Sequence, residues 1–463
     1  MFFTLFLIFE RYSNIKASII SQYVAIESFG FEAGGDYSFS ISESSQPIIF
    51  GVLSKENYTK FKDDESKTPE KYCPVNGNTN YDNISSIQQF FNVSDPTKTI
   101  SGEVPTKGIY YFFSYGCIDS KYNIKYSYEF SNPKTKLDYR DYPSMIEYPI
   151  AIVIFAGLLI VWLINWFMNF RLKIYIHFIL TAVFALALIS SCARYGAISY
   201  ASKNHNNRAV ESAFIVFDLL YSVTLFIFVL LAAKGWCIIR ETIRFSELIL
   251  AISFTVIYLI LQTISTYVSF GKYDIIVIIL MLIAICLYVH QLISAINSAS
   301  LHIRAHLLAI QNAGIDAKTT PVWQKNLMYN MLQWSIIVFL ILIIIHIVIV
   351  YFFPNYGWVD GFIYDIQNIV CLILLGINFR LRGPDAANGY TMIEEPDGTN
   401  EFAMSDIERI DVNSAEFQQG GKQWESGMPL PAPPQVVETP SIVTIESPDG
   451  TTDIIIQPGK YQA

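Results

Sequence analysis

Seven long apolar segments, separated by short polar stretches, dominate the hydrophobic pattern of the middle of this chain. They cover residues 149–167, 174–192, 212–233, 246–268, 274–296, 331–353 and 359–379. Each is close to the length of about 20 residues that a helix needs to cross a bilayer. Hydrocarbon offers no hydrogen-bond partner to a free backbone N–H or C=O, so the segments are expected to be helical. The sequence therefore predicts a membrane all-α bundle of seven helices over residues 146–380.

The segment before the bundle has the period of β-strands. In one stretch every second residue is apolar: Tyr122, Ile124, Tyr126, Tyr128 and Phe130. This alternation is typical of a strand with one buried face, and residues 37–42 repeat it. Residues 108–115 are almost continuously aromatic, as in a strand buried on both faces. We therefore predict an all-β sandwich over residues 28–133, joined to the first helix by a short connector at residues 132–143.

The two ends of the chain predict segments outside these domains. Residues 1–9 are apolar but too short to span a bilayer, and they lie where a secretory signal has its apolar region. We expect a signal peptide over residues 1–20, with an uncleaved buried strand as the alternative. Residues 383–463 are acidic and rich in Pro, Gly and Ser, which predicts a disordered tail.

The tail also carries short patterns that bind other proteins. From Arg380 onward there are five basic and fourteen acidic side chains, which account for the whole net charge of −9. Tyr390 and Ile393 fit the Tyr-x-x-bulky pattern that clathrin adaptors bind. The proline-rich run at residues 429–434 favours a polyproline II conformation.

Three features predict which end of the chain faces the cytosol. Ten Lys and Arg residues near the span ends would be cytosolic if the β head is outside, against Lys203, Arg208 and Lys272 on the other side; short basic loops stay inside. The N-glycosylation acceptors Asn57, Asn83 and Asn92 all lie in the head. The head also holds Cys73 and Cys117, which we expect to form a disulfide in an oxidising lumen, with two free thiols as the alternative.

The layout resembles that of a known superfamily. A small β head ends in an aromatic strand with a cysteine, at residues 108–117, and is followed by a short connector and seven helices. The third helix closes with Lys234, Gly235 and Trp236. This arrangement is similar to the GOLD-domain seven-transmembrane superfamily, in particular its intimal-thickness-receptor-like and lung seven-transmembrane receptor-like branches, and distantly Wntless. The resemblance implies a glycoprotein of the Golgi, endosomes or plasma membrane that acts as a receptor or escorts membrane cargo.

Several polar residues fall within the predicted spans or at their ends. With the head outside, they occupy the lumenal half: Arg194, Asp218, His346, Asp365 and Asn368. A charged group in hydrocarbon requires a partner or a water-filled cavity. Two interpretations are open, namely a pocket for the polar part of a ligand, or an ion-pair network of Arg194 with Asp218 or Asp365 that fixes helix packing.

The histidines do not predict a metal centre. His177 and His290 lie near the other ends of their helices and are expected to be packing residues. His302 and His306 have the spacing of a metal pair but lack a third ligand nearby, and residues 299–311 are better explained as an amphipathic helix on the membrane surface. We therefore predict no metal, no cofactor and no enzyme activity, with an intramembrane metal-dependent hydrolase as a remote alternative.

These observations together predict a seven-helix membrane receptor or sorting protein of the secretory and endocytic pathway. Its expected partners are membrane lipid, a lumenal ligand or cargo protein, and cytosolic adaptors of the clathrin type. The alternative is a receptor at the plasma membrane that couples to G proteins, although no rhodopsin-type motif follows the third helix. The sequence has no clustered basic face that would bind nucleic acid.

Overall fold

The structure is a computed structural model that describes about two thirds of the chain. The described residues are 15–16, 23–44, 48–65, 89–93, 99–116, 123–172, 174–204, 208–239, part of 249–261, 274–352, 357–381, 401–404, 407, 421–425, 428–437, 441–446 and 452–457. The chain forms two compact units. The first contains Met1–Glu147, Tyr195–Glu211 and Phe353–Gly361, and the second contains Tyr148–Arg194, Ser212–Phe352 and Phe362–Ala463.

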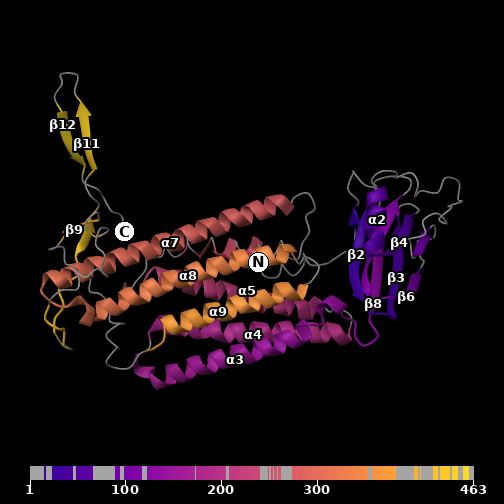
Figure 1. The fold of residues 1–463 in the computed structure, drawn as a ribbon, viewed down its shortest axis with the longest axis horizontal. Helices are drawn as coiled ribbons and strands as arrows, with labels where there is room; N and C mark the ends of the chain where they lie inside the picture. Colours follow the sequence, from indigo (N-terminus) through magenta and orange to yellow (C-terminus); the bar gives the residue numbers. More distant parts are fainter. Residues whose placement is uncertain are drawn as a thin grey trace. The chain divides into compact units, whose positions relative to one another are not determined.

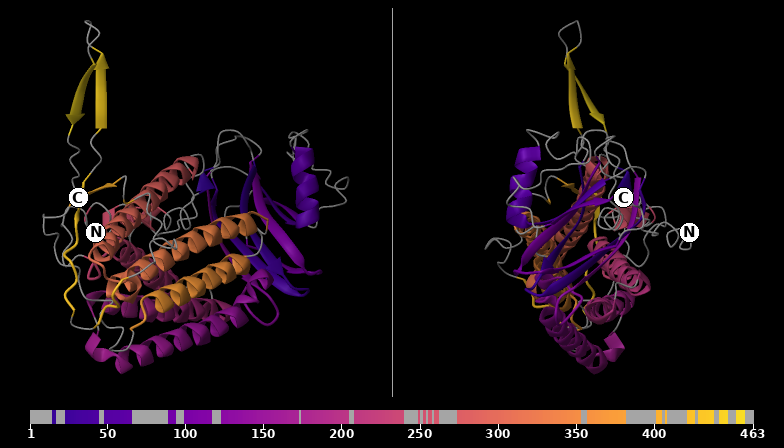
Figure 2. Two further views of the ribbon diagram at one scale, coloured as in Figure 1. Left: turned by 60° about the vertical axis from the view of Figure 1, so that its left-hand side comes forward. Right: turned by 90° about the vertical axis from the view of Figure 1, so that its right-hand side faces the viewer.

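The head of the first unit consists of two four-stranded antiparallel sheets (Figures 1 and 2). One sheet has the order β1 (Ile15–Lys16), β8 (Asn123–Ser131), β3 (Gly35–Ser44) and β6 (Thr99–Val104). The other has the order β2 (Tyr23–Phe31), β7 (Gly108–Gly116), β4 (Ile48–Ser54) and β5 (Gln89–Val93).

An aromatic core joins the two sheets. Phe39 of β3 stacks on Phe50 of β4 with ring centroids 4.3 Å apart, and Phe112 of β7 stacks on Phe130 of β8 at 4.4 Å. All four side chains are almost fully buried. Offset aromatic pairs of this kind contribute about 0.5–1.5 kcal/mol beyond the area they bury. The head is therefore a two-layered β structure. The sequence predicted a β head, but β1 and β2 begin before its predicted start at residue 28.

The three strands predicted from periodicity are confirmed as β3, β7 and β8. On β8 the side chains of Tyr126, Tyr128 and Phe130 pack on the core, while Ser127 and Glu129 are exposed. Strand β7 is central in its sheet and is covered on its second face by α2 (Lys55–Glu65). There the ring of Tyr58 stacks on that of Tyr111 at 4.2 Å.

Six helices are long and apolar enough to cross a membrane among the residues that the structure describes. They are α3 (Ser144–Met168), α4 (Tyr175–Lys203), α5 (Arg208–Ala233), α7 (Asp274–Asn312), α8 (Pro321–Phe352) and α9 (Gly357–Asn378). They run side by side as a bundle (Figures 1 and 2). The seventh predicted span, residues 246–268, lies largely outside the described residues, and the positions described between 249 and 261 are helical.

The outward faces of these helices are apolar. On α3, for example, Val153 is 71% exposed and Phe167 is 66% exposed. Contiguous apolar surface of this extent on several helices is rare in a protein surrounded by water and is expected where helices face lipid. The six apolar helices thus indicate an integral membrane protein.

Two details of the helices differ from the sequence predictions. Residues 299–311 continue α7 without a break, and Ile303, Ala305 and Leu307 are fully buried, so the predicted separate surface helix was wrong. No Gly or Pro interrupts this stretch, and propagation of a helix costs little once it has begun. Pro149, at which the first predicted span begins, lies inside α3, which starts at Ser144.

The tail is more ordered than its composition predicted. Strands β9 (Glu401–Ala403) and β10 (Gln435–Val437) pair in parallel, and β11 (Ser441–Glu446) and β12 (Thr452–Gln457) form an antiparallel hairpin. Ile407 is fully buried. At these described residues the structure differs from the expected disorder over 383–463, and Ile407 and Val436 pack with Leu301 and Ala305 of α7.

The described residues cover only a small part of the predicted signal peptide. Within residues 1–20 these are Ile15 and Lys16, which pair with Ile124 and Asn123 of β8. The apolar run at residues 1–9, for which an uncleaved strand was the alternative, lies outside the described residues. The predicted cleavage remains a prediction.

Candidate functional site

A buried ionic cluster lies among three helices of the second unit. Arg194 of α4 donates from Nη1 to Oδ1 of Asp365 on α9 at 3.0 Å, and from Nη2 to Oδ1 of Asp218 on α5 at 3.3 Å. The side chains of Arg194 and Asp365 are 11% and 6% exposed, whereas that of Asp218 is 30% exposed. One guanidinium thus connects α4, α5 and α9.

Aromatic rings and hydroxyls complete the surroundings of Arg194. The guanidinium carbon lies 5.0–5.5 Å from the ring centroids of Tyr148, Phe214 and Tyr364, within the range of cation–π attraction. Asp218 also accepts hydrogen bonds from Ser190 Oγ at 3.1 Å and from Tyr364 Oη at 3.4 Å. The cation on α4 is therefore held by five side chains from three other helices, α3, α5 and α9.

The cluster lines a small cavity of about 10 Å³, which is room for about one water molecule. Among the described residues, Oδ2 of Asp365, Oγ of Ser191 and Oη of Tyr221 are buried without a hydrogen-bond partner, and all three residues line the cavity with Asn368. In this conformation the cluster can bridge the helices and hold a water-sized molecule. A larger ligand would require the helices to separate.

The structure brings together four of the five residues predicted to form a ligand pocket. Arg194, Asp218, Asp365 and Asn368 line one cavity. His346 does not: its Nδ1 lies 3.4 Å from Oε1 of Gln367. Gln367 is two residues from Asp365, which places it roughly 200° away around α9. The ion pairs of the packing interpretation are present, and the ligand pocket remains a prediction.

Sequence reasoning missed the aromatic residues of the cluster. Tyr148, Phe214 and Tyr364 contact the guanidinium, but the membrane spans are rich in such residues, so nothing marks these three. Only the position of Tyr364 next to Asp365 could have indicated it.

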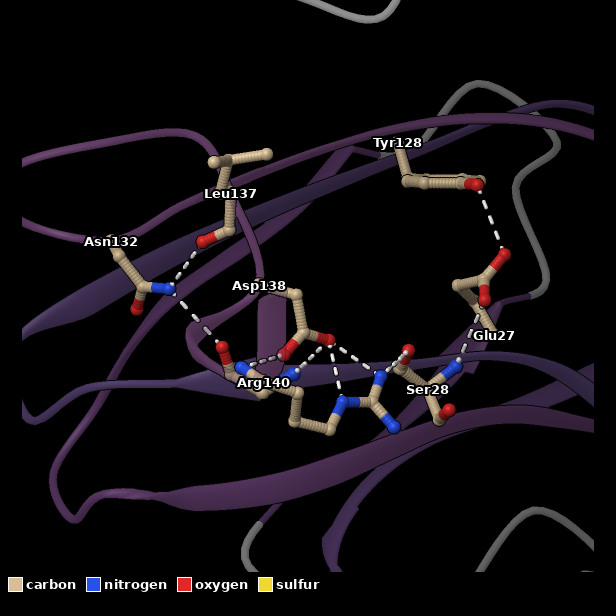
Figure 3. Close-up of polar contacts among 8 residues, drawn as sticks. Glu27, Ser28, Tyr128, Asn132, Leu137, Asp138 and Arg140 are labelled. Atoms are coloured by element: carbon tan, nitrogen blue, oxygen red, sulfur yellow. Dashed lines mark hydrogen bonds and ion pairs between the residues drawn. The ribbon is translucent and has the colours of Figure 1, made fainter. Parts of the chain in front are cut away.

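A second group of polar contacts holds the connector against the head (Figure 3). Oδ2 of Asp138 accepts a hydrogen bond from the backbone N–H of Gly30 in β2 at 2.7 Å, and Oδ1 accepts from the N–H of Arg140 at 2.8 Å. Arg140 forms an ion pair with Asp138 and donates from Nη2 to the carbonyl of Ser28 at 3.0 Å. Gly30 is required because a Cβ there would overlap Asp138 and Tyr139.

Asn132 fixes the start of the connector. Its Nδ2 donates to the carbonyls of Gly30 at 3.1 Å and Leu137 at 2.8 Å, and its Oδ1 accepts from the N–H of Glu32 at 2.6 Å. Asn132 and Asp138 are both buried, and hydrogen bonds to buried polar groups are costly to break. The connector is thus a folded part of the head, and the helix that follows it begins from a fixed point.

The Lys234-Gly235-Trp236 motif forms the end of α5. The N–H of Gly235 bonds to the carbonyl of Ala232 at 3.1 Å, and that of Trp236 bonds to Leu231 at 3.1 Å. These two bonds and the φ of 77° at Gly235 form a Schellman cap, for which glycine is the preferred residue. In this chain the motif has a structural role that accounts for its glycine.

The histidines are dispersed in the described part of the chain. His177 is buried, and its Nδ1 accepts a hydrogen bond from the N–H of Ile174 at 3.2 Å, as expected of a packing residue. His290 is exposed, and Nε2 of His306 lies 2.9 Å from the carbonyl oxygen of Pro431. Among the described residues no group of three or more His, Cys, Asp or Glu could hold a metal ion.

Several predicted sites fall outside the described residues. These are Cys73, Cys117, Asn83, Tyr390 and Ile393. Asn57 lies on α2 and is partly exposed, and Asn92 lies in β5. The disulfide, the sugars and the sorting motif therefore remain predictions.

No protein-family model matches this chain, and the search of curated proteins finds no match either.

Proposed function

We propose that this chain is a receptor or sorting protein of the secretory and endocytic pathway. In this proposal the head binds a lumenal ligand or membrane cargo. The part of the chain on the opposite side of the membrane binds cytosolic adaptors. The observation that carries the proposal is the folded connector. A two-layered β head is continued by Asn132, Asp138 and Arg140 into the first apolar helix.

The connector matters because it also contacts a helix end that belongs to the same unit as the head. Here the N–H of Lys136 and the hydroxyl of Thr135 also donate to the carbonyl of Ser202 in the last turn of α4, at 3.0 and 2.9 Å. Binding energy gained at the head would therefore act on helix ends, as a receptor requires.

The orientation expected from the sequence supports this proposal. Basic residues are concentrated on one side of the spans and the three glycosylation acceptors on the other. The layout is similar to the GOLD-domain seven-transmembrane superfamily, and we propose residues 246–268 as the remaining span. Membership would place the protein in the Golgi, endosomes or plasma membrane.

The orientation is tested first, on sealed microsomes that contain the full chain. We expect endoglycosidase to increase gel mobility, and protease added outside to remove an epitope placed after Ala463. Substitution of Asn57, Asn83 and Asn92 by Gln should abolish the mobility shift. No shift in the unsubstituted chain, or a protected epitope, would overturn the proposed orientation.

The function is then tested by proximity labelling from each end of the chain in living cells. Coat and adaptor subunits at the carboxyl end, with a specific client at the head, would support sorting. Heterotrimeric G proteins at the carboxyl end would instead support a signalling receptor. Labelling that finds neither a client at the head nor cytosolic machinery would contradict both.

A further inference from the structure

The described tail residues pair with the loop between α7 and α8 through their main chains. The N–H of Lys422 donates to the carbonyl of Gly314 at 2.9 Å, and the N–H of Asp316 donates to the carbonyl of Lys422 at 3.0 Å. These two bonds place Lys422 opposite Ile315 as in a parallel sheet. A stretch of tail thus adds to the loop by strand pairing, which is a common way to bind an extended peptide.

Two further polar contacts continue this arrangement along the tail. The N–H of Trp424 donates to Oγ1 of Thr319 at 2.9 Å. Beyond it, the carbonyl of Pro431 meets Nε2 of His306, on α7, at 2.9 Å. The described contacts of the tail thus extend from Lys422 to Pro431, first with Ile315 and Thr319 after α7 and then with His306 on α7 itself.

Apolar contacts accompany the hydrogen bonds. Ile407 and Val436 of the tail pack with Leu301 and Ala305 of α7 in one buried cluster, and Phe402 of β9 lies against it, beside the end of α7 (Figure 1). Leu430 packs on the core of the bundle. Pro433 and Pro434 are buried, so the proline-rich run is part of this contact surface.

Where the tail lies closest to the loop between α7 and α8, at Gly421, there is no room for a side chain. A Cβ on Gly421 would lie 2.6 Å from the backbone nitrogen of Asp316 and 2.7 Å from the carbonyl carbon of Ile315. Both are main-chain atoms, which cannot rotate away as a side chain could. Substitution of Gly421 is therefore a specific test of whether the tail binds the loop as the structure shows.

We propose that the surface formed by residues 301–319 is a docking surface for an extended, proline-containing chain, and that residues 421–437 are its resident occupant. A partner that presents the same chemistry would bind by displacing the tail. The bound tail contributes main-chain hydrogen bonds and a small apolar patch, which is the size of contact that a competing peptide can replace. This proposal is independent of what the head recognises.

Covalent attachment sets how strongly the tail competes. A tethered segment acts at an effective concentration of about 1 mM. If the tail segment has an intrinsic Kd for the surface of about 20 µM, a free peptide of the same sequence would bind roughly fifty times more weakly while the tail is in place. Removing the tail from the surface should reveal the site.

The test uses the purified full chain and a fluorescent peptide of residues 418–440. One protein carries Gly421→Val, which the close approach of Asp316 should dislodge, and the other is unsubstituted. We expect the peptide to bind the substituted protein at least tenfold more tightly. The same peptide carrying Gly421→Val is the matched control and should bind the substituted protein at least tenfold more weakly.

A cross-link provides a second measurement that does not depend on the peptide. A chain with Ile315→Cys and Lys422→Cys should form a disulfide under mild oxidation, and the addition of Gly421→Val should reduce its yield severalfold. Equal peptide binding to both proteins, equal binding of both peptides, no binding at all, or a cross-link unaffected by Gly421→Val would each overturn the proposal.

Discussion

Removing the charge of Arg194 should destabilise the bundle far more than removing that of Asp365. The cluster contains one cation and two anions. Arg194→Gln would leave both carboxylates without their cation, and removal of one partner from a buried pair costs about 3–5 kcal/mol. Asp365→Asn would instead leave Arg194 paired one-to-one with Asp218.

The smaller effect follows from the remaining contacts. The Asn amide oxygen can still accept from Nη1 of Arg194, so we expect Asp365→Asn to cost about 1 kcal/mol, the scale of a weakened hydrogen bond. Asp218→Asn should be similarly mild because its carboxylate is partly exposed. Arg194→Lys is the matched control: it keeps the charge but loses the fork that reaches both carboxylates, and should fall between these extremes.

The four variants are ranked by thermal unfolding of the detergent-solubilised full chain. The measured quantity is the fraction of protein that stays monodisperse on heating. The expected order of destabilisation is Arg194→Gln, Arg194→Lys, then the two Asp→Asn variants. Arg194→Gln as stable as the unsubstituted protein, or Asp365→Asn as damaging as Arg194→Gln, would refute the charge reasoning.

Three further predictions concern the head and the helix ends. Asp138→Asn should cost about 1–3 kcal/mol by removing the ion pair with Arg140, seen as faster proteolysis of the connector; unchanged proteolysis would contradict the fixed connector. Gly235→Ala should cost about 1–2 kcal/mol because of its positive φ, whereas Gly196→Ala, in open space within α4, should be neutral or stabilising; equal melting temperatures would contradict the cap. Burial raises the pKa of Tyr37 to about 12. The folded head therefore resists ionisation of Tyr37, and its free energy of unfolding should fall as pH rises from 10 to 12. In alkaline unfolding, Tyr37→Phe should reduce this dependence of stability on pH.

The membrane helices and the head strands could be predicted because each has a local signal. Length and apolar composition identify a span, and alternation identifies a half-buried strand such as β8. The limits of α3 and α7 were less predictable. Pro149 is tolerated inside α3, and residues 299–311 continue α7, since no residue in between ends the helix.

The polar cluster was only partly predictable. The positions of Arg194, Asp218 and Asp365 along their predicted spans place them at a similar depth in the membrane. Which side chains meet depends on how each helix is rotated about its axis. His346 occupies a similar level and faces Gln367 instead. Rotation depends on the packing of the whole bundle, which the sequence of one helix does not contain.

The tail could not have been predicted from its own composition. Its acidic and Pro-rich sequence lacks the apolar content for an independent core. Ile407 and Val436 are buried because α7 supplies Leu301 and Ala305, about a hundred residues earlier in the chain. Order here results from a surface provided elsewhere, which composition within one segment cannot reveal.

The size of the cluster cavity bears on where recognition takes place. A cavity of about 10 Å³ admits about one water molecule, and Arg194 already donates to two carboxylates. A ligand entering there would have to break these bonds and separate α4, α5 and α9, at a cost comparable to that of Arg194→Gln. Asp365→Asn, which lowers that cost, should therefore strengthen ligand association if the bundle opens to bind and leave it unchanged if the head binds. Capture of the client by Asp365→Asn and by the unsubstituted protein distinguishes binding by the bundle from binding by the head. We expect no difference in capture, as for binding by the head.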